Sequence, residues 1–233
     1  MKSGKRVESP YDGPVQESRI EVAGKSIVLV RPSDPDRLMD DPEVVAWNVE
    51  DDYMPYWAYL WPGAFLLSGA IMEGDWPRGT KALEIGCGLG LPGLVAVSEG
   101  LHVHFTDRDL TPLRFLERSA RANGFDPVNY STGLLDWKVP PDEQYPLIFG
   151  ADVTYERRLI PLVVGVIDAM LEPGGLALIT DPDRVAAQGF VEALRERGLD
   201  AEATPAEARA EDGPIRGTIY RIRRAPISPI ERY

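Results

Sequence analysis

The chain has 233 residues, of which 44% are hydrophobic and 27% charged, a composition typical of a folded globular protein. A chain of this length commonly forms one α/β domain with appendages, and no apolar run approaches the roughly 18 residues that a membrane span needs. The formal net charge of -12 argues against affinity based on phosphate neutralisation, which needs clustered Lys and Arg, so neither a membrane nor nucleic acid is expected as a partner.

Acidity and cysteine content narrow the possibilities further. The acidic balance suits a solvated surface, and it also suits attraction to a basic partner. Cys87 is the only cysteine, so no intramolecular disulfide and no cysteine metal cluster can be built, and no metal is expected. The first residues, MKSGKRVESPYDGP, have no apolar segment behind their Lys and Arg, unlike a secretory signal, so a cytoplasmic location is expected.

The first 60 residues show no alternation of strands and helices. Residues 1–15 combine Gly, Pro and charge without periodicity and are expected to form a mobile tail. Residues 16–60 are expected to form a hairpin and a cap segment. The run from Glu17 to Arg31, ESRIEVAGKSIVLVR, has two β-rich halves around Ala-Gly-Lys, and the polar stretch after it holds at most a short helix.

Residues 61–225 are expected to form the main domain, followed by a C-terminal tail at 226–233. Pro62 fits the first turn of a helix from about Trp61 to Met72. From Lys81 onward strands and helices alternate. Strands are expected at 82–85, 101–107, 128–132, 147–152, 176–181 and 217–224, and helices at 91–99, 111–124, 156–171 and 185–197.

Repeated βα units predict a doubly wound, mostly parallel sheet with helices on both faces. The last strand, GTIYRIRR, follows without a long helical crossover and is expected to pair antiparallel. In such a sheet ligands bind outside the carboxyl ends of the strands, so the residues at the strand ends are the candidate site.

The first strand end is a glycine loop. It reads Glu84-Ile-Gly86-Cys-Gly88-Leu-Gly90, and its glycines allow a tight turn and close approach of a ligand to the backbone. A tight connection without function is one interpretation. Dinucleotide-binding loops are another, but their third glycine comes later. A carboxylate two residues before Gly86 suits a ligand with a cationic head better than a pyrophosphate.

The next two strand ends also carry carboxylates. Asp107, about twenty residues after the first glycine, can accept hydrogen bonds from ribose hydroxyls, or it can cap the next helix, a role open to Asp109 or Thr111 as well. Asp136 and Trp137 offer an acceptor for the adenine amino group and an aromatic face, although Trp137 alone also fits an ordinary buried side chain. An ammonium site, a ribose site and an adenine site in chain order describe S-adenosylmethionine.

The ordered motifs ALEIGCGLGLPG, HFTD, LLDW and FGADVTY, preceded by YWAYLWPGA, resemble those of the seven-strand class I methyltransferases. More narrowly they resemble the branch of small protein-lysine methyltransferases that includes the enzyme acting on the β subunit of electron-transfer flavoprotein. The resemblance covers roughly residues 55 to 224. It implies a Rossmann-like sheet of seven strands, an S-adenosyl-L-methionine cofactor and a protein substrate that presents a lysine.

The resemblance also implies roles for individual residues. Asp152 and Tyr155 match the D-x-x-Y motif of the branch, and they would orient the acceptor amine as the catalytic pair. Tyr56, Trp57 and Tyr59 would form a wall that tolerates a cation. Asp152 could instead cap the following helix, with Tyr155 packed on it. Residues implied to contact the cofactor, besides those at the first three strand ends, are Trp61, Cys87 and Ala151.

Three functions remain open at this stage. The first is N-methylation of a lysine in a protein. The second is N-methylation of a small molecule by the same fold, since relatives methylate lysine, arginine or small molecules. The third is a cofactor-binding module without turnover. A nucleophilic role for Cys87 is disfavoured, because no histidine lies near it in sequence and it belongs to the cofactor loop.

Overall fold

A computed structural model describes residues 8–9, 11–184, 187 and 189–224. The expected C-terminal tail at 226–233 and most of the expected N-terminal tail lie outside the described residues. The core of the fold is one sheet of seven strands in the order β5-β4-β3-β6-β7-β9-β8. The strands are β3 (Lys81–Ile85), β4 (His102–Asp107), β5 (Tyr130–Leu134), β6 (Tyr145–Ala151), β7 (Leu171–Asp181), β8 (Leu199–Ala210) and β9 (Gly213–Arg224).

The pairing directions confirm the predicted fold class. The neighbours from β5 to β7 pair parallel, whereas β9 runs antiparallel to both β7 and β8. The strand order reverses between β4–β3 and β3–β6, which is where a doubly wound sheet opens a crevice for a ligand. The candidate strand ends at β3, β4 and β6 therefore lie side by side.

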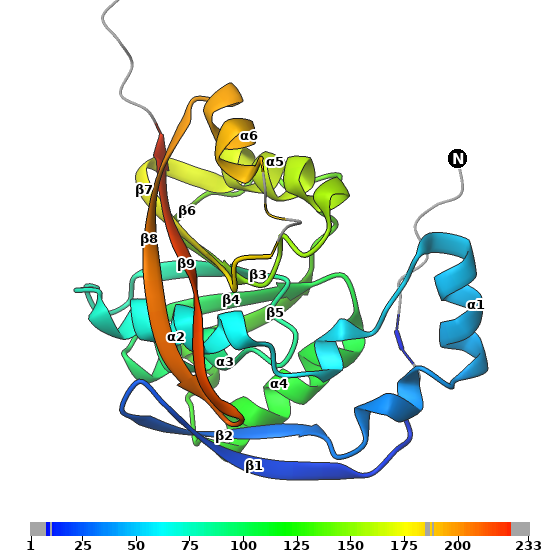
Figure 1. The fold of residues 1–233 in the computed structure, drawn as a ribbon. Coiled ribbons are helices and arrows are strands. Elements are labelled where there is room, and N and C mark those ends of the chain that lie inside the picture. Colours follow the sequence, from blue (N-terminus) through cyan, green and yellow to red (C-terminus); the bar gives the residue numbers. More distant parts are fainter. Residues whose placement is uncertain (1–7, 10, 185–186, 188, 225–233) are drawn as a thin grey trace, which may run out of the picture.

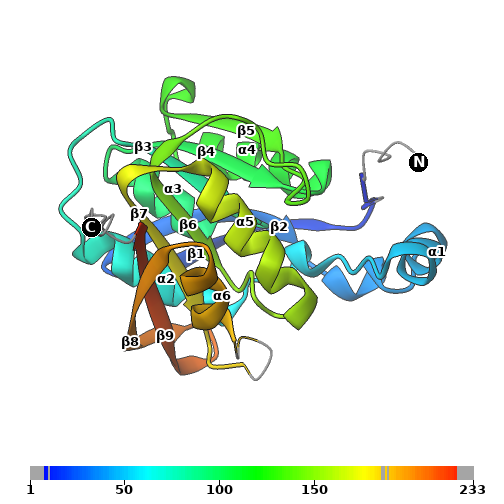
Figure 2. The ribbon, with the colours of Figure 1, turned by 90° about the horizontal axis from the view of Figure 1, so that it is seen from above.

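Helices cover both faces of the sheet (Figures 1 and 2). One face carries α2 (Pro62–Glu73), α3 (Leu91–Ser98) and α4 (Leu110–Ala122); the other carries α5 (Ile160–Met170) and α6 (Phe190–Glu196). Successive residues of β3 show the division, because Ala82 packs on the α3 side and Leu83 on the α5 side. A strand buried on both faces needs an almost continuous apolar run, which explains the sequence KALEI.

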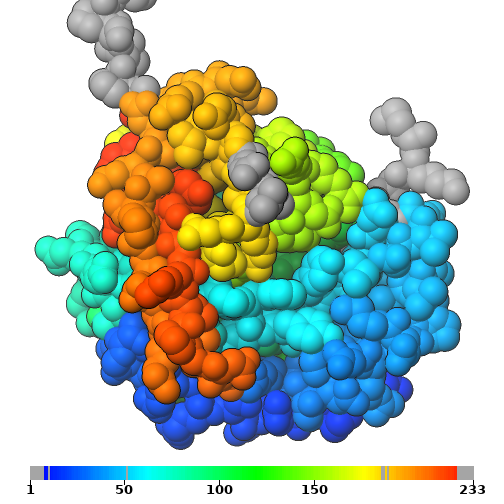
Figure 3. Space-filling view, in the orientation of Figure 1, coloured from blue at the N-terminus to red at the C-terminus, as the bar shows by residue number. Residues whose placement is uncertain are grey.

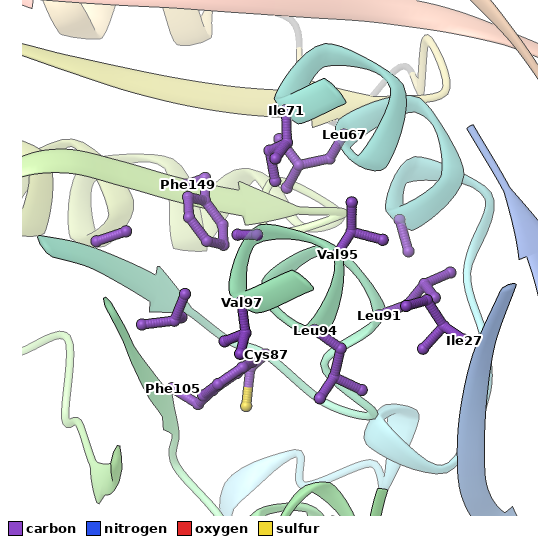
Figure 4. Packing of buried hydrophobic residues seen from close by; sticks show 14 of the residues in the cluster. Ile27, Leu67, Ile71, Cys87, Leu91, Leu94, Val95, Val97, Phe105 and Phe149 are labelled. Carbon is purple, nitrogen blue, oxygen red and sulfur yellow. The ribbon is translucent and has the colours of Figure 1, made fainter. Parts of the chain in front are cut away.

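The core on the α3 side is densely aromatic and aliphatic. Figure 4 shows Phe105 of β4 and Phe149 of β6 beside the valines of α3, with Leu67 and Ile71 of α2 above them. The two phenylalanines, Leu67 and Ile71 are all fully buried. Because α3 is apolar on every side, it must lie between two layers, and the second layer is supplied by the N-terminal hairpin.

The N-terminal hairpin pairs β1 (Val15–Val22) with β2 (Lys25–Pro32) and lies below the helix layer in Figure 1. Its turn residues Ala23 and Gly24 have φ of 48° and 78°, as a two-residue turn that follows the strand twist requires. The amide of Asn123, at the end of α4, accepts from the Val28 N–H at 2.9 Å and donates to the Val28 carbonyl at 2.7 Å. The side chain thus satisfies backbone groups on the edge of β2.

A cap segment joins the hairpin to α2 and includes a helix that the sequence analysis did not predict. It comprises α1 (Pro42–Asp51) between the 3₁₀ turns η1 (Pro35–Leu38) and η2 (Tyr56–Ala58). Asp41 caps α1 by accepting from the N–H groups of Glu43 and Val44. The helix has no clear apolar stripe, because Val44 is buried while Val49 is 84% exposed, and this is why its periodicity gave no signal.

The strand β8 was also missing from the predicted elements. Its sequence, LDAEATPAEARA, is rich in Ala and contains two Glu, residues that favour helices, yet all twelve residues pair with β9. Strand formation here is decided by the partner strand, which itself begins at Gly213 instead of the expected 217. The turn of this long hairpin reaches β2, where Arg31 makes two hydrogen bonds of 2.8 Å to Glu211 (Figure 1).

Two predicted helices begin later than expected. The helix expected at 156–171 begins as the 3₁₀ turn η4 (Arg157–Leu159), and α5 ends at Met170 because β7 starts with Leu171. The helix expected at 185–197 is α6, which begins at Phe190 after Gly189, whose φ is 92°. Residues 185–186 and 188 of that prediction lie outside the described residues. A further turn, η3 (Pro127–Asn129), precedes β5.

The described end of the expected N-terminal tail is packed against the domain. Ser9 is 2% exposed, and its N–H donates to Asp109 Oδ1 at 3.2 Å. Its carbonyl accepts from the Thr111 hydroxyl at 2.8 Å, and its hydroxyl accepts from the Trp57 indole at 3.0 Å. These bonds tie the chain before β1 to the start of α4 and to η2.

Candidate active site

The glycine loop connects β3 to α3 with three residues in the left-handed region. Gly86, Gly88 and Gly90 have φ of 59°, 50° and 72°, which residues with a Cβ rarely adopt. Space is also limited, because a Cβ on Gly90 would overlap Leu116 and one on Gly86 would lie 3.1 Å from Trp137 Cζ2. The alternating glycines are therefore required by the backbone and by the close packing, and they bring the loop against the end of β5.

Asp107, at the end of β4, holds the glycine loop directly. Its Oδ2 accepts from the Gly88 N–H at 3.0 Å, and its Oδ1 accepts from the Asp109 N–H at 3.1 Å. The helix-cap role belongs to Asp109, which accepts from the Thr111 N–H at 2.8 Å, so Asp107 is not the cap of α4. Burial raises the pKa of Asp107 to about 6, while the backbone N–H groups act in the opposite direction.

Glu84 is a residue of β3, and its carboxyl group lies against the first turn of α3. It is 2% exposed, and a Cβ on Gly93 would overlap its Oε2. Burial raises the pKa of Glu84 well above its usual range, partly offset by the Gly93 N–H. Within the described part of the chain Oε2 has no hydrogen-bond partner. A buried carboxyl without a full set of partners, directly under the loop, is compatible with a positive group above it.

The residues after β5 divide between the loop and solvent. The ring of Trp137 is half-buried and lies beside Gly86 and Val153. Asp136 is exposed, and its Oδ1 accepts from the Lys138 N–H at 2.9 Å. The structure thus brings Trp137 to the glycine loop, as a ring next to a ligand on that loop would require, and leaves the Asp136 carboxylate at the rim.

Asp152 follows Ala151 at the end of β6 and faces the start of α2. It has φ of 57°, is 7% exposed and donates its N–H to the Thr180 carbonyl at 3.0 Å. A Cβ on Gly63 would overlap its Oδ2, and the Gly63 N–H favours the ionised carboxylate. Asp152 therefore lies at the N-terminus of α2 and does not cap the helix that follows it, since η4 and α5 have no side-chain cap among the described residues.

Tyr155 belongs to a chain of aromatic rings at this strand end. Its ring centroid lies 5.3 Å from that of Tyr56, which lies 5.7 Å from Trp61, and Tyr59 lies 5.9 Å from Trp61. The Trp61 indole donates to the Tyr56 carbonyl at 2.7 Å, which fixes the angle of the wall. Burial is the main cause that raises the pKa of Tyr155 to about 12, so its hydroxyl stays protonated at neutral pH.

Trp57 does not belong to this wall, contrary to expectation. The residue is 7% exposed, its ring packs at a tilt on Phe115 of α4 with the centroids 5.5 Å apart, and its indole N–H donates to the Ser9 hydroxyl. It packs with the cluster under the cap segment instead. The backbone of Trp57 still contributes to the site, because it lies 3.5 Å from where a Cβ of Gly88 would be. The 3₁₀ turn η2 alternates its side chains between wall and core, which sequence spacing does not reveal.

Two residues that the sequence analysis did not single out complete the surroundings of Asp152. Arg184, beyond the end of β7, forms an ion pair with Asp152 and lies with its Cζ 5.7 Å from the ring centroid of Trp61. Gly63 provides the space for the carboxylate. Gly63 follows Pro62 in the predicted helix start, which is a usable signal, whereas nothing in the sequence connects Arg184 with Asp152. In Figure 3 the cyan start of α2 lies between the blue cap segment and the yellow residues after β7.

A seven-strand sheet in this order, with a glycine loop after β3 and an acid at the end of β4, defines the class I methyltransferase fold. A solved structure with this fold, that of ribosomal protein L11 methylase from Lactobacillus delbrueckii subsp. bulgaricus, superposes with a TM-score of 0.56 at 18% identity, covering 69% of this chain and 77% of that chain. The chain belongs to the lysine methyltransferase family, whose pattern matches residues 58–197. Family and fold imply S-adenosyl-L-methionine as the cofactor.

Two curated relatives are similar at moderate identity. EEF1A lysine methyltransferase 3 of Mus musculus is 27% identical over 65% of this chain and 65% of its own length. The electron transfer flavoprotein beta subunit lysine methyltransferase of Xenopus laevis is 28% identical over 56% of this chain and 53% of its own length. The matched region thus spans less than two thirds of either relative. The resemblance of this chain to the protein-lysine methyltransferase branch, which the motifs predicted, is confirmed.

No helix among the described residues is long and apolar enough to cross a membrane.

Proposed function

We propose that this protein transfers the methyl group of S-adenosyl-L-methionine to the side-chain nitrogen of a lysine in a protein. The observation that carries the proposal is the pairing of the buried Asp152 carboxylate with the wall of Tyr155, Tyr56 and Trp61, next to the glycine loop. A carboxylate beside aromatic faces suits an amine that becomes more positively charged as it is methylated. The names of both curated relatives, each a lysine methyltransferase, support the same acceptor chemistry.

The strand ends supply a complete cofactor site in this proposal. The backbone of Gly86, Gly88 and Gly90 holds the amino-acid part, and Asp107 accepts from the ribose hydroxyls with the lone pairs that its two backbone donors leave open. Cys87, Ala151 and Trp61 line the remaining sides, with Asp136 and Trp137 at the adenine. The positive end of the cofactor over the loop favours the ionised form of Glu84 beneath it.

Asp152 and Tyr155 act on the acceptor. The cofactor supplies an activated methyl group, so the protein needs mainly to orient a neutral amine and to exclude water. Asp152, with a pKa raised by burial and lowered by Arg184, accepts a hydrogen bond from the amine and orients its lone pair. The Tyr155 phenol, protonated at neutral pH, serves as a ring and a hydrogen-bond donor and does not serve as a base.

The partner in this proposal is a protein and not a small molecule or a nucleic acid, and the compartment is the cytoplasm. The acidic balance of the chain, with 37 Asp and Glu against 25 Lys and Arg, favours a lysine-rich partner segment. The single cysteine is buried and unpaired, so the fold does not depend on an oxidising environment.

The test is transfer of radiolabelled methyl groups into a lysate of the source organism. Label in one or a few protein bands, with lysine identified as the acceptor by mass spectrometry, is the expected result. Label only in the small-molecule fraction, or cofactor binding without any transfer, would overturn the proposal. Asp152→Asn should abolish the label, whereas the matched variant Asp142→Asn, an exposed acid near the opposite end of β6, should retain it.

A further inference from the structure

Arg184 places a cation of this chain on the acid of the proposed acceptor site. Its Nη1 pairs with Asp152 Oδ1 and lies 3.6 Å from Asp181 Oδ2, and its guanidinium carbon lies 5.7 Å from the centre of the Trp61 ring. These are the two groups that the proposed function assigns to the acceptor ammonium: a carboxylate and an aromatic face. The Arg184 guanidinium therefore contacts both groups before an acceptor binds.

The contact between Arg184 and Asp152 is close but poorly directed. Among the described residues, neither oxygen of Asp152 nor the Arg184 Nη1 makes a hydrogen bond with good geometry, although all three atoms are buried. A buried ion pair without well-aligned hydrogen bonds recovers little more than the desolvation of its charges. An incoming cation that aligns better with Asp152 can therefore replace the guanidinium at small cost.

Asp181 gives the displaced guanidinium a second carboxylate. This residue is fully buried at the end of β7, where its Oδ2 accepts from the Thr154 hydroxyl at 3.1 Å. Its Oδ1 accepts from the Arg184 N–H at 2.6 Å, so the backbone of Arg184 stays anchored while the side chain turns. The cluster contains two carboxyl groups and one guanidinium, so one carboxyl group is left to pair with a further ammonium.

We propose that Arg184 is a specificity-determining residue of the acceptor site: its guanidinium occupies the place of the acceptor ammonium between Asp152 and Trp61, and only an acceptor that displaces it can be methylated. The inference rests on the proposed function, which puts the acceptor at Asp152. A free amine brings no binding energy other than that of its ammonium group, so it competes poorly with a tethered cation. A lysine on a protein surface draws on contacts elsewhere, and this selects protein acceptors over free amines.

The experiment measures binding of n-butylammonium, a lysine side-chain mimic, to the full chain saturated with S-adenosylhomocysteine. Titration of the tryptophan indole N–H signals by NMR, with the Trp61 signal assigned from Trp61→Phe, gives the dissociation constant without any methyl transfer. Arg184→Met keeps the apolar stem on Trp61 and removes the cation, whereas Arg184→Lys keeps a cation. Arg158→Met is the matched control, because Arg158 is an exposed arginine paired with Asp52 and Glu156 on the neighbouring loop.

Arg184→Met should bind n-butylammonium about tenfold or more tightly than the wild type, as expected when the competent state is populated to about 10% or less. Arg184→Lys should stay near the wild type, and Arg158→Met should change the affinity less than about twofold, as expected for an exposed ion pair. Adding Asp152→Asn to Arg184→Met should remove the gain.

Three results would overturn the inference. They are an unchanged affinity in Arg184→Met, an equal gain in Arg184→Lys, and a gain that survives Asp152→Asn. The outcome is independent of methyl transfer into the lysate. If no label is transferred in the lysate but Arg184→Met gains affinity for n-butylammonium, the result supports the cation site and contradicts the proposed lysine methylation. If label is transferred into protein but Arg184→Met gains no affinity, the result supports the proposed activity and contradicts the role of Arg184.

Discussion

The affinity of the wild-type chain for S-adenosylmethionine should fall about tenfold between pH 7.5 and pH 5, because Asp107 becomes protonated. Burial raises the pKa of Asp107 to about 6. For a pKa of about 6 the ionised fraction is roughly 97% at pH 7.5 and roughly 9% at pH 5. In the proposed cofactor site the ribose hydroxyls donate to the ionised form, so cofactor binding must first remove the proton at the lower pH.

Asp107→Asn isolates this contribution. At pH 8 it should weaken cofactor binding by about 1.5 to 3 kcal/mol, through the loss of charge-assisted hydrogen bonds to the ribose. The amide oxygen can still accept from one of the two backbone N–H groups, of Gly88 and Asp109, that now bind the carboxylate. At pH 5, where the wild type is mostly protonated, the difference between the two proteins should shrink.

Isothermal titration calorimetry at constant ionic strength from pH 5 to pH 8 measures both effects. Glu84 is the other buried carboxyl near the loop with a raised pKa, and it is retained in Asp107→Asn, so any slope left in the variant reports Glu84. The reasoning is refuted if wild-type affinity is flat across this range or if Asp107→Asn keeps the full tenfold change. Unchanged affinity of the variant at pH 8 would remove Asp107 from the ribose site.

Three further predictions concern the acceptor side and the cap segment. Tyr155→Phe should keep cofactor affinity within about twofold and preserve the pH profile of transfer, because the phenol is not the base. Tyr155→Ala should lower the transfer rate. Loss of cofactor binding in either variant would show that the cofactor and acceptor sites are not separate. Gly63→Ala should lower transfer and cost about 1 to 3 kcal/mol of stability, since its Cβ overlaps Asp152, while Gly69→Ala on the same helix has open space and should keep full activity in parallel assays. Asp41→Ala should destabilise α1 by about 0.5 to 2 kcal/mol, seen as faster amide exchange confined to that helix; protection equal to the wild type would argue against the cap.

The sheet was predictable where a local pattern coincided with burial. Strands such as β3 place apolar residues on both faces, Ala82 on one and Leu83 and Ile85 on the other, and each is followed by a turn and a helix, so element type and order follow from the sequence alone. The strand β8 was not predicted because Ala alternates mostly with polar or charged residues along a half-exposed edge. Only pairing with β9 makes this segment a strand. The helix α1 was not predicted because its apolar residues do not share one face.

Proximity to the glycine loop was predictable for a residue at the carboxyl end of a strand of the parallel sheet. Parallel strands bring their carboxyl ends to one edge, so Asp107 had to lie near the glycine loop, and its bond to Gly88 shows this. The roles of Trp57 and Arg184 could not be predicted in this way. Trp57 lies in a 3₁₀ turn whose side chains point in different directions, and Arg184 meets Asp152 only through the fold.

The sequence by itself determined the class of fold and the positions of the glycines, because left-handed backbone and close packing leave no alternative at Gly86 and Gly90. It also determined which acids follow the strands. Only the tertiary structure decided which partner each acid has: backbone N–H groups for Asp107, the first turn of α3 for Glu84, and Gly63 with Arg184 for Asp152. The physical reason is that charge pairing and desolvation depend on distances in space, which the order of residues along the chain does not contain.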